Sequence, residues 1–298
     1  MKVLELFSGY GSQALALKYL GINFTSDISE IDKYAIQAYK QLHGLTYNYG
    51  DIREIDETKL PYYDLITYSS PCQDFSIAGL GKGGDVDSGT RSSLLWQCER
   101  IIRAVKPKYL LMENVKGLLS NKHKHNFDKW LEILESLGYQ NFWKVLNAKD
   151  YGIPQNRERI FVVSILGNEN YIFPDKFDCK TQLKDILESQ VDEKYYITEQ
   201  YENYIKNKET KQHHFRVEIS DPNGIRKTPL RAAGDRACVK DGIRIRRFTP
   251  KECWKLMGVK DDDFNKLHDI SHHQLYKLSG NSIVVNVLME IFKNLLCK

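Results

Sequence analysis

Short apolar runs that alternate with helical patterns constrain the fold of this chain more than any other feature. Five runs of strand length lie before residue 167, namely Val3–Phe7, Ile22–Ile28, Leu65–Tyr68, Leu110–Met112 and Ile160–Ile165. Helical spacing of apolar residues occurs between them, at Ser12–Leu20, Ile31–Leu42, Ser92–Val105 and Phe127–Leu137. Strand–helix alternation of this kind is typical of α/β proteins. We therefore predict a doubly wound, mostly parallel sheet.

The length and composition agree with a globular α/β protein. The chain has 298 residues, of which 42% are hydrophobic and 28% are charged, enough for one large domain with a smaller module. No apolar stretch is long enough to span a membrane, and Met1–Phe7 is too short for the apolar region of a signal peptide. We therefore expect a cytoplasmic protein that does not bind membranes.

The six cysteines indicate neither a disulfide framework nor a metal site. None of them forms a CxxC pair or a zinc-ligand spacing with a histidine. Most are expected to be small buried side chains in a reducing compartment, without metal. Cys72 is treated separately below.

The composition changes near residue 188. Segment 188–250 is polar, and its second half is basic, with Arg216, Arg226, Lys227, Arg231, Arg236, Lys240, Arg244, Arg246 and Arg247. A solvated charged face and a nucleic-acid surface both explain such a run, and the net charge of +4 permits either. Helical spacing returns at Pro250–Met257, and a final helix is expected over Ser282–Leu296.

A glycine turn follows the first predicted strand. Residues 7–14 read Phe-Ser-Gly-Tyr-Gly-Ser-Gln-Ala, a G-x-G-x-x-A turn that lets the backbone approach a ligand. Glu30 follows the second strand, where an acid commonly binds ribose hydroxyls. Asp51 is either an acceptor for an adenine amino group or an ordinary turn aspartate. The turn alone leaves NAD(P), FAD and S-adenosylmethionine open.

Two further strand ends carry reactive side chains. Pro71-Cys72-Gln73 follows the run that ends at Tyr68, and Glu113-Asn114 follows the run that ends at Met112. Neighbouring strand ends of an open α/β sheet share one ligand crevice, so a thiol and a carboxylate would face one pocket. Arg157 and Arg159 are candidate cations that could lower the pKa of the thiol. The alternative is that these groups are structural strand-end residues with weak surface ion pairs.

Taken in order, the motifs resemble those of the C5-cytosine-specific DNA methyltransferase family over nearly the whole chain. They are the segments 7–11, 50–52, 71–76, 91–94, 113–115, 155–159, 246–253 and 280–287, together with Glu30. The resemblance implies a methyltransferase sheet with a smaller, irregular target-recognition domain. It assigns 1–187 to the catalytic and cofactor domain, 188–250 to target recognition, 251–280 to a hinge, and 281–298 to a helix that completes the catalytic domain.

The resemblance also implies ligands and roles. The cofactor would be S-adenosylmethionine, held by Phe7, Ser8, Gly9, Gly11, Glu30, Asp51, Ile52, Pro71, Asn281 and Ser282. Cys72 would attack C6 of cytosine, Glu113 and Arg159 would bind the ring, and Asn114 would brace the Cys72 turn. Double-stranded DNA, with its target base flipped out, would be contacted by Arg157, Thr228, Arg231 and Arg236. A monomer is expected, as is a bacterial or phage modification enzyme that can accompany a restriction endonuclease.

Three alternatives are weighed against this interpretation. A tRNA-methylating branch of the same family shares the catalytic motifs, but its Cys-Phe-Thr tripeptide is absent here. A DNA-binding protein without activity would not need Cys72, Glu113 and Arg159. A dehydrogenase explains only the segment from Gly9 to Glu30. Two departures from the family pattern affect loop packing rather than chemistry: Ser69-Ser70 stands before Pro71, and Pro229 interrupts a Thr-Leu pair.

Overall fold

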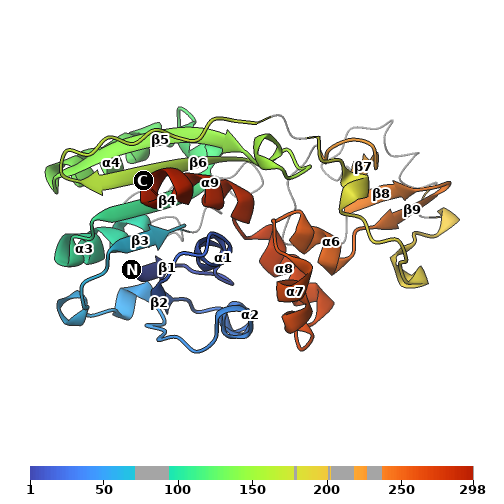
Figure 1. The fold of residues 1–298 in the computed structure, drawn as a ribbon, viewed down its shortest axis with the longest axis horizontal. Coiled ribbons are helices and arrows are strands. Elements are labelled where there is room, and N and C mark those ends of the chain that lie inside the picture. The colour runs from blue at the N-terminus through green and yellow to red at the C-terminus, as the bar shows by residue number, and fades with distance from the viewer. Residues whose placement is uncertain (71–93, 178–179, 201, 203–217, 227–236, 298) are drawn as a thin grey trace. The chain divides into compact units, whose positions relative to one another are not determined.

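The structure is a computed structural model that describes residues 1–70, 94–177, 180–200, 202, 218–226 and 237–297. It contains two compact units. The first unit comprises Met1–Asn147, Glu158–Asp175 and Val287–Lys298, and the second comprises Ala148–Arg157 and Lys176–Asn286. Each unit is described by itself below, with the elements labelled as in Figure 1.

A six-stranded sheet forms the centre of the first unit. Its strands are β1 (Lys2–Leu6), β2 (Thr25–Ser29), β3 (Leu65–Tyr68), β4 (Tyr109–Val115), β5 (Tyr139–Asn147) and β6 (Glu158–Leu166), in the order β2-β1-β3-β4-β6-β5. The first four strands of this order are parallel to one another, whereas β6 is antiparallel to both of its neighbours. The predicted mostly parallel α/β fold is therefore confirmed.

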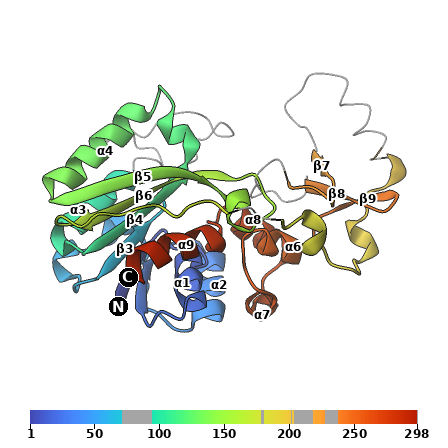
Figure 2. The same cartoon turned by 45° about the horizontal axis from the view of Figure 1, so that its top comes forward.

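Helices cover both faces of this sheet. They are α1 (Ser12–Tyr19), α2 (Lys33–His43), α3 (Leu95–Val105), α4 (Lys124–Ser136) and, from Val287 on, α9 (Val285–Leu296). Helices α3 and α4 bury Ile101, Trp130 and Leu134 against the strands in the main core, whereas α1, α2 and α9 lie on the opposite face (Figure 2). The last helix is tied to this unit by a hydrogen bond from Asn294 Nδ2 to the carbonyl of Ile172, 3.0 Å long.

The strand order fixes where a ligand can bind. The chain passes from β1 outward to β2 and then returns across β1 to β3. Such a reversal opens a crevice outside the carboxyl ends of the two central strands. The turn after β1 and the segment after β3 begin at this position.

The second unit is smaller and less regular. Its three-stranded sheet comprises β7 (Glu218–Ser220), β8 (Ala237–Asp241) and β9 (Arg244–Arg247) in that order, with α6 (Pro250–Lys255), α7 (Asp261–Phe264) and α8 (His272–Gly280) following. Helix α6 starts where it does because Thr249 and Glu252 form a capping box and Pro250 occupies its first turn.

Single turns of 3₁₀ helix also occur in both units. They are Ile52–Glu54, Glu57–Lys59, Lys116–Leu119, Ala148–Tyr151, Leu183–Asp185, Glu193–Tyr195 and Asn265–Leu267.

Strand β5 is the element of the main sheet that the sequence pattern did not predict. It is an edge strand whose residues alternate irregularly between buried and exposed, and Trp143 is 46% exposed. An antiparallel edge strand with one solvated face does not carry the continuous apolar run of a central parallel strand. Helices α7 and α8 were also not predicted, because the segment 251–280 was interpreted as a hinge. The predicted domain boundaries themselves stay a prediction.

Candidate active site

The glycine turn after β1 has a left-handed backbone at three positions. The φ angles are 57° at Phe7, 57° at Gly9 and 82° at Gly11. Glycine adopts this conformation readily, but Phe7 does not, and such strain concentrates at functional sites. The turn is attached to the end of β2 by a hydrogen bond from the Phe7 amide to the carbonyl of Ser29, 2.8 Å long. The sequence predicted the glycines but not the left-handed Phe7.

Glu30 lies directly against this turn. Its Oε2 accepts a hydrogen bond from the Gly9 amide at 2.9 Å, and its Oε1 accepts from the amides of Ile31 and Asp32, both at 2.8 Å. A carboxylate oxygen can accept two hydrogen bonds, so Oε2 keeps capacity for a ligand hydroxyl. No atom of the residues that the structure describes lies within 4 Å of a Cβ built on Gly9. This part of the chain therefore leaves space beside the predicted ribose acceptor.

Asn48 is a site residue that the sequence did not single out. Its Oδ1 accepts hydrogen bonds from the amides of Glu30 and Gly50, at 3.1 and 3.0 Å, and its Nδ2 donates to the carbonyl of Glu30 at 3.0 Å. One amide side chain thus joins the end of β2 to the turn that precedes Asp51. A lone asparagine in a loop carries no sequence signal that distinguishes this role.

Asp51 and Ile52 have structural partners in this unit. Asp51 caps the turn Ile52–Glu54 and pairs with Arg53, which lowers the pKa of the Asp51 carboxyl. The side chain of Arg53 is 66% exposed, so this ion pair is weak. The Asp51 carboxylate can therefore bind another partner in place of Arg53. Ile52 is 3% exposed and packs in the main core.

Glu113 and Arg159 form an ion pair at the end of β4. The Nε atom of Arg159 lies 3.1 Å from Oε1 of Glu113, and the two side chains are 18% and 11% exposed, respectively. Antiparallel pairing places Glu113 opposite Phe161 and Val115 opposite Arg159. The two charged residues are therefore diagonal neighbours on one face of the sheet. The structure brings these two predicted residues together.

Asn114 connects β4 to the segment after β3. Its buried Nδ2 lies 3.4 Å from the carbonyl oxygen of Ser70 and 3.3 Å from Oγ of Ser70. Ser70 stands two positions before Cys72 in the sequence. This contact is the kind expected if Asn114 supports the segment that leads to Cys72. Pro71 and Cys72 themselves lie outside the described residues.

Arg157, Ser282 and Asn281 lie in the second unit. Arg157 is 3% exposed, and its Nη2 donates to the carbonyls of Gly280 and Ser282 at 3.1 and 2.6 Å. Its guanidinium therefore supports the segment that carries Asn281 and Ser282, and its predicted contact with DNA stays a prediction. Asn281 is exposed and Ser282 is buried. Their predicted part in the cofactor site stays a prediction.

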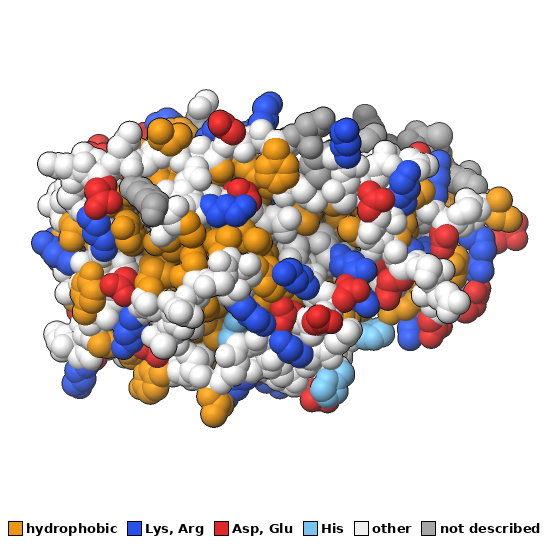
Figure 3. Space-filling view, viewed as in Figure 1, with side chains coloured by type: hydrophobic (Ala, Val, Ile, Leu, Met, Phe, Trp, Pro, Cys, Tyr) orange, Lys and Arg blue, Asp and Glu red, His pale blue; other side chains and the backbone are white. Residues whose placement is uncertain are grey.

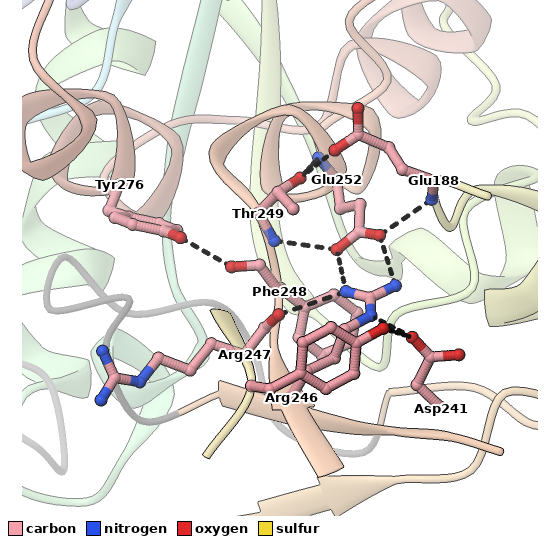
Figure 4. A network of polar contacts seen from close by, with 9 residues as sticks. Glu188, Asp241, Arg246, Arg247, Phe248, Thr249, Glu252 and Tyr276 are labelled. Atoms are coloured by element: carbon pink, nitrogen blue, oxygen red, sulfur yellow. Dashed lines mark hydrogen bonds and ion pairs between the residues drawn. The ribbon is translucent and has the colours of Figure 1, made fainter. Parts of the chain in front are cut away.

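The basic residues of segment 188–250 do not share one environment. Arg226 and Arg246 are 4% and 1% exposed, so neither a solvated face nor a nucleic-acid surface describes these two. Figure 4 shows Arg246 between Glu252 and Asp241, with both Nη atoms bonded to the Glu252 carboxylate at 2.9 and 2.8 Å. Thr228, Arg231 and Arg236 lie outside the described residues.

Three further observations concern the surface charge, membrane-spanning helices and groups of metal-binding side chains. Lys and Arg side chains are interspersed with Asp and Glu on the face shown in Figure 3. Within the described ranges, no helix is long and apolar enough to cross a membrane. No group of three or more His, Cys, Asp and Glu side chains in the same part of the chain could hold a metal ion.

The family model described as C-5 cytosine-specific DNA methylase matches residues 1–297. The chain belongs to this family. Its activity is therefore DNA cytosine-5 methylation, and the predicted family and enzyme class are confirmed.

Named relatives are similar over their full length. The chain is 40% identical to the type II methyltransferase M2.ScrFI of Lactococcus lactis subsp. cremoris, over 99% of each chain. It is 33% identical to the type II methyltransferase M.HhaI of Haemophilus parahaemolyticus, over 99% of this chain and 94% of that one. It is also 29% identical to the orphan methyltransferase M.SPRI of Bacillus phage SPR, over 99% and 97%.

Solved structures of the same fold are more distant in sequence. The methyltransferase EhMeth of Entamoeba histolytica has a TM-score of 0.80 at 19% identity, over 100% of this chain and 98% of that one. The Dnmt2 methyltransferase of S. pombe has a TM-score of 0.75 at 21% identity, over 99% and 98%. At these identities the similarity establishes the fold.

Proposed function

We propose that this enzyme transfers a methyl group from S-adenosylmethionine to C5 of a cytosine within a short, specific sequence of double-stranded DNA. The observation that supports it most directly is the ion pair between Glu113 and Arg159, held 3.1 Å apart at the end of β4. A carboxyl group and a guanidinium on one sheet face are complementary to the polar edge of a pyrimidine, which presents a ring nitrogen, an amino group and a carbonyl oxygen.

The turn after β1 fits the adenosine part of S-adenosylmethionine. Glu30 supplies an acceptor for ribose hydroxyls, Gly9 lies beside open space, and Ile31 offers an apolar face that is 71% exposed. Phe7, Ser8 and Gly11 complete the turn, and Asp51 stands at the neighbouring strand end as an acceptor for an amino group. S-adenosylmethionine supplies the methyl group that the reaction consumes.

The residues of the chain would activate the cytosine. Cys72 attacks C6 as a thiolate, which makes C5 nucleophilic and divides one difficult step into easier ones. Glu113 binds the N3 and amino edge and supplies or shares the proton at N3. Arg159 binds O2 and stabilises the negative charge that develops on the ring. Asn114 holds Ser70 and thereby the approach to Cys72.

The target base has to leave the duplex before Cys72 can reach C6. Flipping a base costs a few kcal/mol, which phosphate contacts of the basic recognition segment can offset. Arg231, Arg236 and Thr228 remain the candidates for contacts with DNA. The shortness of this segment favours a short target sequence.

Relatives named as type II methyltransferases support a role in restriction-modification, and relatives named as phage orphan methyltransferases support anti-restriction. A cognate endonuclease is a partner in the first case only. We propose that the enzyme acts as a monomer in the cytoplasm. Incubating the enzyme with labelled cofactor and either duplex DNA or tRNA tests the substrate directly, and methylation of tRNA alone would contradict this proposal.

The deciding experiment traps the covalent intermediate. Bisulfite sequencing of DNA from a methylation-free host that expresses the chain identifies the target sequence. A duplex that carries 5-fluorocytosine at the target position should then become covalently attached to the enzyme when S-adenosylmethionine is present. Release of the enzyme requires loss of the group at C5, and fluorine cannot leave as a proton does.

Two variants test the assigned roles. Cys72→Ala should form no adduct and show no turnover but should keep its affinity for the duplex. Glu113→Gln should lower kcat by about 10²–10³-fold, the effect typical of losing one group that stabilises developing charge. Turnover by Cys72→Ala, or target DNA that is methylated without any adduct on the fluorinated duplex, would exclude the covalent mechanism.

A further inference from the structure

Tyr39 of α2 is a buried residue outside the predicted cofactor set that touches the elements surrounding the glycine turn. Its side chain is fully buried, and it packs with Ala14 of α1 and Ile28 of β2 in a small cluster of its own. These contacts join two helices and a strand. The sequence offers no reason to separate Tyr39 from the other apolar positions of its helix.

The hydroxyl group of Tyr39 is held on two sides. It donates to Oε1 of Glu5 at 2.5 Å and lies 2.7 Å from Oγ of Ser26, whose hydroxyl can then donate to it. Glu5 is fully buried on β1, two positions before Phe7. A hydrogen bond to a buried carboxyl group is strong and directional. The hydroxyl therefore fixes the tyrosine ring relative to both β1 and β2.

The ring of Tyr39 closes against Gly11. A Cβ built on Gly11 would lie 2.6 Å from Cε2 of Tyr39 and 2.6 Å from Nε2 of His43. His43 lies one helical turn beyond Tyr39, with the two ring centroids 4.4 Å apart. Its Nε2 is 3.1 Å from the carbonyl oxygen of Tyr10. Side chains of α2 thus contact the turn at two consecutive residues.

We propose that Tyr39 is a positioning residue that holds the turn from Phe7 to Gly11 in the conformation that binds S-adenosylmethionine. The turn carries three left-handed residues, and such a backbone persists only where its surroundings hold it. Ser29 and Glu30 hold the turn from β2, and Tyr39 with His43 holds it from α2. This inference rests on the proposed cofactor and adds a residue that need not touch it.

A residue of this kind is separable from one that only stabilises the core. Loss of a core contact lowers the melting temperature but leaves the affinity of the folded enzyme for its cofactor unchanged. Loss of a positioning contact raises Kd and KM for the cofactor, whereas kcat at saturating cofactor changes little. The decisive measurement is therefore the change in cofactor Kd, compared with the change in melting temperature.

The experiment compares Tyr39→Phe with Tyr139→Phe in the full-length enzyme. Tyr139 is 3% exposed on the edge strand β5, and its hydroxyl donates to the carbonyl of Pro107 at 2.8 Å, away from the glycine turn. Each variant loses one buried hydroxyl and keeps the ring; the Tyr39 hydroxyl contacts both Glu5 and Ser26. Cofactor Kd is measured by isothermal titration calorimetry, KM and kcat by methyl transfer to target DNA, and the melting temperature by calorimetry.

Tyr39→Phe should weaken cofactor binding about tenfold, the loss expected for one buried hydrogen bond. Its kcat at saturating cofactor should stay within about twofold of the parent value, because the hydroxyl acts only through the turn. Tyr139→Phe should lower the melting temperature and leave Kd unchanged. Equal Kd values for the parent and Tyr39→Phe would overturn the inference.

A second pair of variants covers the case in which Tyr39→Phe does not fold. Glu5→Gln keeps an acceptor for the tyrosine hydroxyl and should retain the parent Kd, whereas Glu5→Leu removes the acceptor and should weaken binding as Tyr39→Phe does. Equal Kd values for these two variants would again exclude positioning through this hydrogen bond. Failure of the parent enzyme to bind S-adenosylmethionine would instead refute the proposed cofactor, so the two failures are distinguishable.

Discussion

Glu5 is a buried acid on the strand that leads into the cofactor turn. Burial raises the pKa of its carboxyl group from 4.5 to about 7, although hydrogen bonds from Tyr39 and from the Ala14 amide act in the opposite direction. Between these two pH values the folded chain keeps a proton that the unfolded chain has lost. The stability associated with protonated Glu5 is therefore complete below pH 4.5 and is lost as the pH rises through 7.

We predict that Glu5→Gln removes this pH dependence. The shift corresponds to about 3 kcal/mol, since one pKa unit is worth about 1.4 kcal/mol. The variant should match the parent in free energy of unfolding near pH 4.5 and exceed it by up to that amount at pH 8. Urea unfolding of both proteins across this range measures the difference. A difference that does not grow with pH would show that Glu5 is not the titrating group.

Residues whose roles could be predicted from sequence are those that a motif fixes in position. Gly9, Gly11 and Glu30 occur at a spacing that only a nucleotide-type turn explains, and the structure brings them together. Tyr39 contacts the same turn, and Asn48 bonds to the backbone of Glu30, from positions that carry no motif. Their roles depend on which backbone atoms lie nearby, and that is set by the packing of α2 and of the loop after it.

At the scale of elements, antiparallel pairing of β6 with β4 is what joins Arg159 to Glu113. The sequence placed both residues at strand ends, with Arg159 as a candidate cation beside the Cys72 thiol and, by the family resemblance, as a group that binds the cytosine ring. In a parallel β6, Arg159 would lie at the opposite end of the strands, beside the amino end of β4. The antiparallel insertion of β6 between β4 and β5 is thus the feature that brings these two candidate site residues together.

A second element-scale feature is the buried ion pair that joins β9 to α6. The side chains of Arg246 and Glu252 are 1% and 0% exposed. The Glu252 carboxylate also accepts hydrogen bonds from the amides of Thr249 and Glu188, at 2.8 and 2.9 Å (Figure 4). Every oxygen of this carboxylate is engaged. The network fixes the end of the small sheet to the first turn of α6.

We predict that Glu252→Gln destabilises the second unit by about 3 kcal/mol, because it leaves the buried Arg246 charge with Asp241, whose side chain is 41% exposed, as its remaining carboxylate partner. The matched control is Glu193→Gln, which breaks the surface pair with Arg244, whose side chains are 74% and 48% exposed, respectively. The control should cost much less, because an exposed ion pair contributes little to stability. Thermal and urea unfolding measure the loss of stability in both variants. Equal losses would contradict the expectation that burial makes the Arg246–Glu252 pair more important than the surface pair.

At the scale of the whole molecule, the chain separates into two units that are not continuous in sequence. The segment Ala148–Arg157 belongs to the second unit although strands β5 and β6 on either side of it belong to the first. The predicted domain boundaries near residues 188, 251 and 281 stay a prediction. Contacts between residues more than a hundred positions apart, such as that of Gln155 Nε2 with the carbonyl of Leu256, join this segment to the second unit.

We predict that recognition of DNA and binding of cofactor are separable in this molecule. Arg231→Ala or Arg236→Ala should weaken or relax binding to the target duplex and leave the Kd for S-adenosylmethionine unchanged. The control is Arg103→Ala on α3, which removes the same charge from an exposed surface pair of the first unit. Binding is compared at several salt concentrations, since a lost phosphate contact reduces the salt dependence. Equal effects of all three changes would remove the two arginines from the interface.

By itself the sequence determined the α/β class, the positions of the central strands, the family and the catalytic motifs. These features depend on local periodicity and on residues at fixed spacing, which a chain displays before it folds. Only the tertiary structure decided that β6 runs antiparallel, that Arg157, Arg226 and Arg246 are buried, and that Tyr39 closes against Gly11. Those outcomes depend on contacts between residues far apart in the chain, where packing space and hydrogen-bond partners, rather than residue type, select the arrangement.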